Sequence, residues 1–224
     1  MKSAENVLEI RDLVKDFPGV RAVDNVSFNI KRNTVHCLVG ENGAGKSTLI
    51  KILTGAYART SGTTLLNGQE YSPHNPKDAR DKGISTLFQE LNVVDQLTVE
   101  DNLTLGMEDT KFGFIRKTDK INKIISVMNS IEPSIHPKQK VSTLSVAQKQ
   151  IVEIAKAAAT DSDVIIMDEP TAAITEGEIE RLFSIIQSLR EQNVTVIYIS
   201  HRLDEIFEIG DYVTVLRDGK HIDT

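Results

Sequence analysis

A glycine-rich segment near the start of the chain has residue types that could bind a phosphate group. Residues 40–47 read Gly-Glu-Asn-Gly-Ala-Gly-Lys-Ser and match the pattern G-x-x-x-x-G-K-[ST]. Glycines let the backbone wrap a phosphate with its N–H groups inward, and a helix beginning near Lys46 adds its positive dipole end. Lys46 is expected to reach the β- and γ-phosphates, and the Ser47 hydroxyl to ligate Mg²⁺. A glycine-rich turn without a ligand is the alternative, which the flanking strand and helix disfavour.

Two adjacent carboxylates follow a strongly apolar segment. Val164–Met167 is apolar throughout and rich in β-branched residues, and Asp168 and Glu169 come directly after it. Acidic residues at the carboxyl edge of a parallel sheet lie where ligands bind in open α/β folds. We expect Asp168 to hold Mg²⁺ and Glu169 to orient or deprotonate an attacking water. Such a pair alone is usually solvated loop charge, but together with the phosphate-binding pattern it predicts a catalytic site.

Two further polar residues follow predicted strands in the same way. Gln89 comes after Ile84–Phe88, and His201 comes after Val194–Ile199 with one serine between them. A lone histidine at a strand end is most often structural or solvated. His201 is of interest because several strand ends of one sheet converge on one ligand. A glutamine at such a point can bridge a metal and a water without carrying charge.

Strands and helices alternate along most of the chain, which predicts a parallel sheet covered on both faces. Strands are expected at Val7–Leu13, Val23–Ile30, Val35–Val39, Thr63–Leu66, Ile84–Phe88, Val164–Met167, Val194–Ile199 and Tyr212–Leu216. Helices are expected at Lys46–Thr54, between Asn75-Pro76 and Gly83, from Ser145 to about Ala159 and from Thr175 to about Gln192. The first 30 residues, together with hairpin turns at Asn67-Gly68 and Asp218-Gly219, add antiparallel strands at an edge.

The predicted fold class is therefore α/β, with a P-loop NTPase core, a mostly parallel sheet, an antiparallel β part and a helical part. Residues about 92–142 lack long β-branched runs and are expected to be rich in helix. One domain is expected over 1–224. Within it, about 1–88 and 160–224 would form the core with its antiparallel part, and about 89–159 a helical subdomain.

The composition excludes several other classes of protein. The 224 residues are 40% hydrophobic and 26% charged, as in an ordinary globular domain. No apolar run exceeds four residues, so neither a membrane span nor a signal peptide is expected. The net charge of −6 argues against nucleic-acid binding, which usually needs a basic surface. The single cysteine, Cys37, excludes a disulfide framework within the chain.

These motifs, in their order and spacing, resemble those of ABC-transporter ATPases over essentially the whole chain. The resemblance rests on Gly40–Ser47, Gln89, Leu144-Ser145, Asp168-Glu169 and His201. Finer segments resemble the class that imports simple sugars such as ribose, galactose and xylose: Phe17-Pro18-Gly19-Val20, Gly40-Glu41-Asn42, Gln89-Glu90-Leu91-Asn92, Glu153-Ile154-Ala155-Lys156 and Ser200-His201-Arg202. The resemblance implies ATP hydrolysis with Mg²⁺, transmembrane permease subunits as partners, an indirect role for a solute-binding protein, and a peripheral position on the cytoplasmic face of the cell membrane.

The resemblance also implies a role for each matching position. Phe17 would stack on the adenine, although a phenylalanine of the core or rim is the alternative. The phosphates would be bound by Gly40, Asn42, Gly43, Ala44, Gly45, Lys46, Ser47 and Thr48. The metal would be held by Ser47, Gln89 and Asp168. Glu169 would be the catalytic base, His201 would hold the γ-phosphate and the water, and Gln89 would couple the metal to the membrane subunit.

Two segments depart from the family pattern. The signature loop Leu-Ser-Gly-Gly-Gln, which faces the nucleotide of a partner domain, is replaced by Leu144 followed by Ser145, Val146, Ala147 and Gln148. The Cβ atoms of Val146 and Ala147 restrict close backbone approach. The segment after the carboxylates ends in Thr175 where the family has Asp. In the sugar class two such domains share one longer chain, so the resemblance implies a second ABC ATPase domain and a first domain represented here.

Other functions remain possible at this point. An ABC ATPase for another solute, such as a nucleoside, would differ little in sequence because the ATPase does not touch the solute. A soluble, non-transport ABC ATPase acting on DNA or the ribosome is disfavoured by the acidic charge. A nucleotide switch without turnover is disfavoured by the presence of Glu169 and His201.

Overall fold

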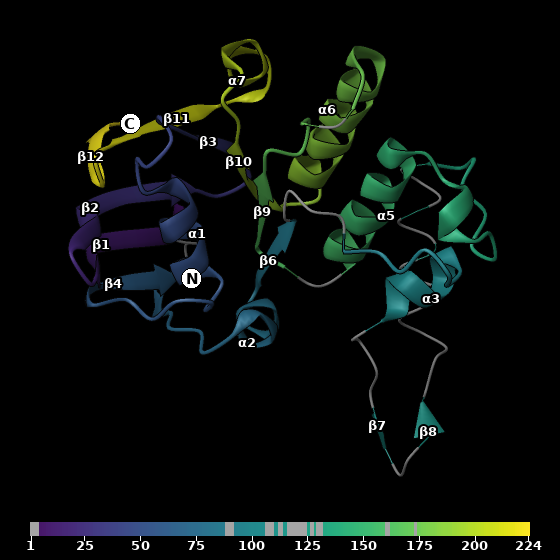
Figure 1. The fold of residues 1–224 in the computed structure, drawn as a ribbon, viewed down its shortest axis with the longest axis horizontal. Helices are drawn as coiled ribbons and strands as arrows, with labels where there is room; N and C mark the ends of the chain where they lie inside the picture. The colour runs from purple at the N-terminus through teal and green to yellow at the C-terminus, as the bar shows by residue number, and fades with distance from the viewer. Residues whose placement is uncertain are drawn as a thin grey trace.

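The computed structural model describes residues 5–87, 92–105, 110–111, 114–115, 125, 128, 132–159, 162–172 and 174–224. Its centre is a six-stranded sheet (Figure 1). In spatial order the strands are β12 (Lys220–Asp223), β11 (Tyr212–Arg217), β3 (Val35–Val39), β10 (Thr195–Ile199), β9 (Val164–Asp168) and β6 (Ile84–Leu87). All neighbours pair in parallel except β11 and β12, which form an antiparallel hairpin at one edge. The predicted parallel sheet is confirmed.

A second, antiparallel sheet packs beside the first. Its order is β2 (Val20–Lys31), β1 (Asn6–Phe17), β4 (Ser61–Leu66) and β5 (Gln69–Glu70). The turns at Pro18-Gly19 and Asn67-Gly68 join β1 to β2 and β4 to β5. Asn67 and Gly68 both have positive φ, 55° and 76°, which is why this pair favours a tight hairpin. The first two strands are longer than predicted, because bulges interrupt the alternation that marks a strand in the sequence.

Helices connect many of the strands, and side chains cap the starts of several helices. The helices are α1 (Lys46–Leu53), α2 (Pro76–Asp81), α3 (Val99–Thr104), α5 (Val146–Ala159), α6 (Glu176–Glu191) and α7 (Leu203–Ile209). The Asn75 side chain accepts the N–H of Asp78 at 2.9 Å at the start of α2. At the start of α6, the Glu178 carboxylate accepts the N–H of Thr175 at 2.8 Å. The helix starts predicted at Asn75-Pro76 and at Thr175 are confirmed, whereas the short helix α7 was not predicted.

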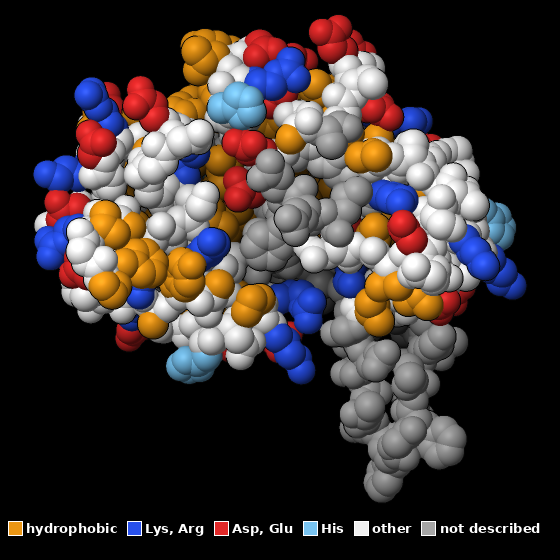
Figure 2. Space-filling model, viewed as in Figure 1, with side chains coloured by type: hydrophobic (Ala, Val, Ile, Leu, Met, Phe, Trp, Pro, Cys, Tyr) orange, Lys and Arg blue, Asp and Glu red, His pale blue; other side chains and the backbone are white. Residues whose placement is uncertain are grey.

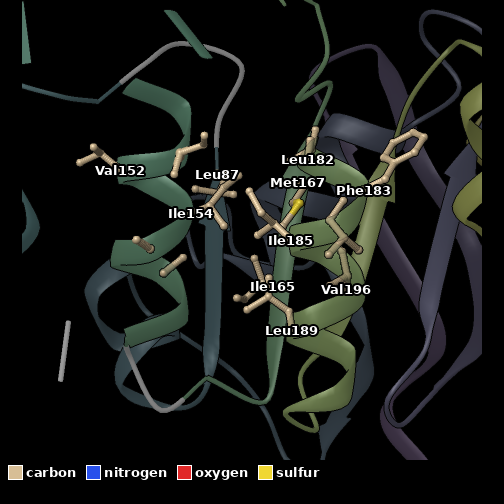
Figure 3. Close-up of a cluster of buried hydrophobic side chains, with 14 of the residues drawn as sticks. Leu87, Val152, Ile154, Ile165, Met167, Leu182, Phe183, Ile185, Leu189 and Val196 are labelled. Atoms are coloured by element: carbon tan, nitrogen blue, oxygen red, sulfur yellow. The ribbon is translucent and has the colours of Figure 1, made fainter. Parts of the chain in front are cut away.

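The strands of the central sheet are buried on both faces. In β9, Ile165 and Met167 join a core with α5 and α6, while Val164 and Ile166 join a second core with α1 and the antiparallel sheet. Figure 3 shows Ile165 and Met167 facing side chains from α5 and α6, among them Ile154. Alternate residues of one strand therefore serve two cores, which explains why these strands are continuously apolar in the sequence.

The described part of residues 92–142 contains several short elements. They include the six-residue α3, the 3₁₀ turn η1 (Val141–Thr143) and a small hairpin of β7 (Thr110–Lys111) and β8 (Phe114–Ile115). The predicted division into a core and a helical subdomain remains a prediction. Among the helices of the described residues, none is both long and apolar enough to span a bilayer.

Candidate functional site

Three neighbouring strands end at the same level at one edge of the central sheet. Ile199 of β10 pairs with Leu38 of β3 on one side and with Asp168 of β9 on the other. The glycine-rich loop follows β3, the carboxylates stand at the end of β9, and His201 follows β10. The register therefore brings three of the predicted site segments to one edge. Gln89, which follows β6, lies outside the described residues.

Backbone geometry explains the glycines of the loop at 40–45. Gly43 and Gly45 have φ of 84° and 100°, a region that residues with a Cβ rarely adopt. A Cβ on Gly45 would lie 2.6 Å from the carbonyl oxygen of Ala22, and one on Gly40 would overlap the Leu216 carbonyl oxygen. The loop thus needs glycine both for its turn and for its close approach to the neighbouring strands β2 and β11.

The loop opens into a groove of about 490 Å³ at the N-terminus of α1. Predicted residues Asn42, Gly43, Ala44, Gly45, Lys46, Ser47 and Thr48 all line it. The Lys46 ammonium donates to the carbonyl oxygens of Gly40 at 2.5 Å and Glu41 at 3.0 Å, which keeps its charge beside the loop. First-turn N–H groups and a lysine converging on one groove form a site suited to a phosphate chain.

Sequence reasoning missed the opposite wall of this groove, which is formed by Val20–Ala22 and Asp218-Gly219. The Gly219 N–H donates to the Ala44 carbonyl at 3.2 Å and ties the β11–β12 turn to the loop. The Asp24 N–H donates in turn to the Gly219 carbonyl at 2.7 Å. No local sequence pattern predicts these contacts, because they depend on how the two sheets pack.

Phe17 lies at the end of β1 and is half-buried. Its ring packs edge-on against Tyr57, with 5.3 Å between ring centroids, and the Lys15 ammonium lies 4.9 Å from its centroid. Phe17 is not among the residues that line the phosphate groove. The structure therefore places it in an aromatic and cationic cluster, and its predicted contact with adenine remains a prediction.

Glu169 and His201 contact each other at the sheet edge. Their Oε1 and Nδ1 atoms are 3.2 Å apart, with side chains 28% and 68% exposed. Glu169 has a φ of 47°, and its N–H donates to the Ile199 carbonyl at 2.9 Å. A non-glycine residue in this backbone region is uncommon and is found most often at functional sites. The bent backbone turns the Glu169 side chain toward the loop that carries His201.

Asp168 is electrostatically linked to the phosphate-binding helix. Burial raises the pKa of Asp168 most, the charge of Glu169 raises it further, and Lys46 and Lys51 of α1 oppose the rise. Cationic groups therefore favour the charged carboxylate that metal binding requires.

The oxygen groups at this edge suit Mg²⁺. Ser47 lines the groove with a hydroxyl, and Asp168 supplies a carboxylate. Mg²⁺ prefers oxygen ligands and is usually bound by one or two protein groups together with phosphates and waters. Among the described residues, no cluster of three or more His, Cys, Asp or Glu side chains could hold a metal. The Ser47 hydroxyl and the Asp168 carboxylate fit a magnesium ion that is bound together with phosphate groups.

The residues at 145–148 lie apart from the phosphate groove. The Ser145 hydroxyl accepts the Gln148 N–H at 3.2 Å, and the Gln148 amide oxygen accepts the Ser145 N–H at 3.0 Å, so the pair caps α5. Ser145, Ala147 and Gln148 line a separate hollow of about 300 Å³ between α5 and α6. Val146 is 46% exposed. The chain does not bring this segment to its own phosphate loop.

The parallel sheet, the glycine loop at its edge and the adjoining carboxylates define a P-loop nucleotide-binding protein. Residues 23–172 match the family model described as "ABC transporter", and the chain belongs to that family. Two crystal structures share its fold over nearly the whole chain. A nucleotide-free ATP-binding cassette from an ABC transporter has a TM-score of 0.87 and 27% identity, with 97% of this chain and 90% of that chain covered. The ADP conformation of another ATP-binding cassette of an ABC transporter has a TM-score of 0.88 and 28% identity, with 98% of this chain and 90% of that chain covered.

Curated relatives are more similar in sequence. The galactose/methyl galactoside import ATP-binding protein MglA of Clostridium perfringens is 48% identical over 224 residues, which are 100% of this chain and 44% of that protein. The protein of the same name in Escherichia coli K12 is 46% identical over 222 residues, 99% of this chain and 44% of that protein. A putative ribose/galactose/methyl galactoside import ATP-binding protein of Geobacillus kaustophilus is 48% identical, with 99% and 44% covered. The chain thus spans less than half the length of these relatives.

Proposed function

We propose that this chain binds and hydrolyses ATP and that the hydrolysis powers the import of a simple sugar by an ABC transporter. The observation that carries the proposal is the shared register of β3, β10 and β9, which sets the phosphate loop, His201 and the two carboxylates at one edge. A sugar as the transported solute is supported by relatives that are named for galactose and ribose import and that match this chain over nearly its full length.

In this proposal the loop at 40–45 and the Lys46 ammonium bind the phosphates, with Thr48 further along the same groove. Ser47 and Asp168 hold Mg²⁺, which neutralises charge on the β- and γ-phosphates when bound. Gln89 is proposed as a further metal ligand, on sequence grounds alone. Phe17, in its cluster with Tyr57, is proposed to stack on the adenine.

Hydrolysis requires a water to attack the terminal phosphorus. We assign Glu169 the role of accepting the proton of that water, and His201 the role of holding the γ-phosphate and orienting the water. Their 3.2 Å contact keeps both side chains together at the sheet edge where β3, β10 and β9 end, which supports these roles. Catalysis in this class consists mainly of positioning and electrostatic stabilisation, which such an arrangement can supply.

The proposed partner domain is suggested by the relatives, because this chain spans only 44% of their length. A second ABC ATPase domain would face this one, and residues Ser145–Gln148 would contact its nucleotide. Their separation from the phosphate groove of this chain supports that arrangement. Val146 and Ala147, in place of glycines, would make this contact weaker than in the family pattern.

Permease subunits would place the domain at the cytoplasmic face of the membrane, and a solute-binding protein would act through them. We propose no nucleic-acid partner. The net charge of −6 disfavours nucleic-acid binding, which usually needs a basic surface, and Figure 2 shows acidic and basic side chains interspersed over the described part of the face in view.

Calorimetric titration of Mg·ATP tests nucleotide binding. The unmodified chain is expected to bind, Lys46→Ala to lose binding, and Lys77→Ala, at an exposed lysine of α2, to retain it. Absence of binding by the unmodified chain, or equal binding by both variants, contradicts the proposed site. Uptake of labelled galactose, ribose and xylose by vesicles holding the assembled transporter then tests the solute.

A further inference from the structure

A buried carboxylate lies directly behind the sheet edge. Glu205 stands in the first turn of α7, and it is only 2% exposed. Burying a charged group is costly unless hydrogen bonds or an ion pair compensate it. The hydrogen-bond and ion-pair partners of Glu205 therefore show which segments its side chain connects.

Three hydroxyl groups donate to one oxygen of this carboxylate. The distances to Glu205 Oε2 are 2.8 Å from Ser200, 2.9 Å from Tyr198 and 3.0 Å from Thr171. The other oxygen, Oε1, lies 3.2 Å from the Arg202 guanidinium. Burial and the neighbouring Glu205 raise the pKa of Tyr198, so its hydroxyl keeps its proton and donates. One side chain thus joins β10, α7 and the two loops that follow β9 and β10.

These two loops carry the residues assigned to catalysis. Ser200 and Arg202 stand on either side of His201, and the Arg202 N–H also donates to the Ser200 hydroxyl at 3.0 Å. Thr171 follows Glu169 by two positions in the loop after β9. The His201 side chain itself is 68% exposed, and Glu169 is the partner found for it in the described residues. The position of the imidazole therefore depends on how its backbone neighbours are anchored.

We propose that Glu205 is a positioning residue for ATP hydrolysis, because its carboxylate fixes the loops of Glu169 and His201 relative to each other. This inference rests on the proposed function, in which both residues act on the terminal phosphate. Glu205 touches neither substrate nor metal in this proposal. It acts through Ser200 and Thr171, whose hydroxyls meet at one of its oxygens.

Two substitutions weaken the link while keeping the side-chain shape, because hydrogen bonds to a charged acceptor are stronger than those to a neutral one. Glu205→Gln retains one oxygen acceptor but places an uncharged amide where Arg202 now finds a carboxylate. Thr171→Val removes only the donor from the loop after β9 and keeps the protein testable if the first variant fails to fold. Glu208→Gln is the matched control, because it makes the same change at an exposed position of the same helix.

The first measurement needs no nucleotide. The ring resonances of His201, identified by their loss in His201→Gln, are followed by NMR in the full protein. We expect Glu205→Gln and Thr171→Val to shift them, with those of the distant, exposed His74 unchanged, and Glu208→Gln to shift neither. Unchanged His201 resonances in the folded Glu205→Gln and Thr171→Val proteins overturn the positioning role.

The second measurement separates positioning from simple stabilisation. In the assembled transporter, Glu205→Gln is expected to lower kcat by about tenfold to a hundredfold, with a small change in the KM for ATP. A purely structural role would lower the unfolding temperature and leave kcat of the folded protein unchanged, which contradicts the inference. If the unmodified transporter shows no ATPase activity, the proposed function fails, while the NMR comparison still decides whether Glu205 holds His201.

Discussion

The Nδ1 atom of His201 lies 3.2 Å from the Oε1 atom of Glu169, across the ends of two adjacent parallel strands. This contact joins a group that can carry positive charge to a carboxylate whose backbone is bent into the left-handed region. In the proposed reaction the same carboxylate must accept a proton from water. Its negative charge is therefore the property to test first.

Glu169→Gln keeps the size of the side chain and removes its ability to take up a proton. We expect ATP binding to persist and kcat to fall by about a hundredfold to ten-thousandfold, the usual contribution of a general base. Calorimetry gives the affinity, and phosphate release by the assembled transporter gives kcat. Glu180→Gln, at an exposed position of α6, should change neither. Undiminished turnover in Glu169→Gln would exclude Glu169 as the base.

Gly45→Ala should damage the phosphate loop. The added Cβ would lie 2.6 Å from the Ala22 carbonyl oxygen, at a residue whose φ is 100°. Backbone strain of this kind costs about 1–3 kcal/mol, and the loop must also move away from β2. We expect both the free energy of unfolding and the affinity for Mg·ATP to fall.

Gly177→Ala is the matched control for that substitution. Gly177 lies in the first turn of α6, and a Cβ there meets no atom within 4 Å. Alanine at such a position should stabilise the protein by about 0.5–1 kcal/mol. Urea unfolding of both variants measures the difference. Equal effects at the two glycines would show that the close approach at Gly45 is unimportant.

Much of the site could be predicted because its parts are marked locally. The phosphate loop, Asp168-Glu169 and His201 each follow a short apolar strand, and parallel strands bring their ends to one edge. Glu205 could not be predicted in this way. In the sequence it resembles an ordinary acidic residue in the first turn of a helix, and its burial depends on donors from two separate segments, the end of β10 and the loop after β9. The groove wall at Asp218-Gly219 was missed for the same reason, since it depends on tertiary packing.

A buried amide stabilises the turn before α3. Asn102 is 2% exposed; its Oδ1 accepts the Val94 N–H at 2.7 Å, and its Nδ2 donates to the carbonyls of Val94 and Thr98 at 2.9 and 3.0 Å. Asn102→Asp would set a carboxylate oxygen against two carbonyl oxygens. We expect a loss of about 3 kcal/mol or more in the free energy of unfolding at neutral pH. Asn29→Asp, on the exposed side of β2, should cost little, and equal losses would contradict this account.

His36 should make the stability of the protein sensitive to mild acid. It lies in β3 with 1% of its surface exposed, stacked against Phe28 at 5.7 Å between ring centroids, and its Nε2 contacts the Thr214 hydroxyl at 2.7 Å. Burial, with a smaller effect of His221, lowers the pKa of His36 from 6.5 to about 4. Because the unfolded chain binds the proton more readily, the contribution of His36 is complete above pH 6.5 and is lost as pH falls toward 4.

The size of this effect follows from the difference in pKa. A depression from 6.5 to about 4 corresponds to a loss of about 3 kcal/mol across that interval. Urea unfolding between pH 4 and 7.5 measures this loss, and His36→Phe should flatten the profile because an aromatic ring stays and the ionisable group goes. His74→Gln, at an exposed histidine, should leave the profile as it is in the unmodified chain. If His36→Phe kept the full acid sensitivity, the loss of stability would have to come from other groups, and His36 would be only a packing residue between the two sheets.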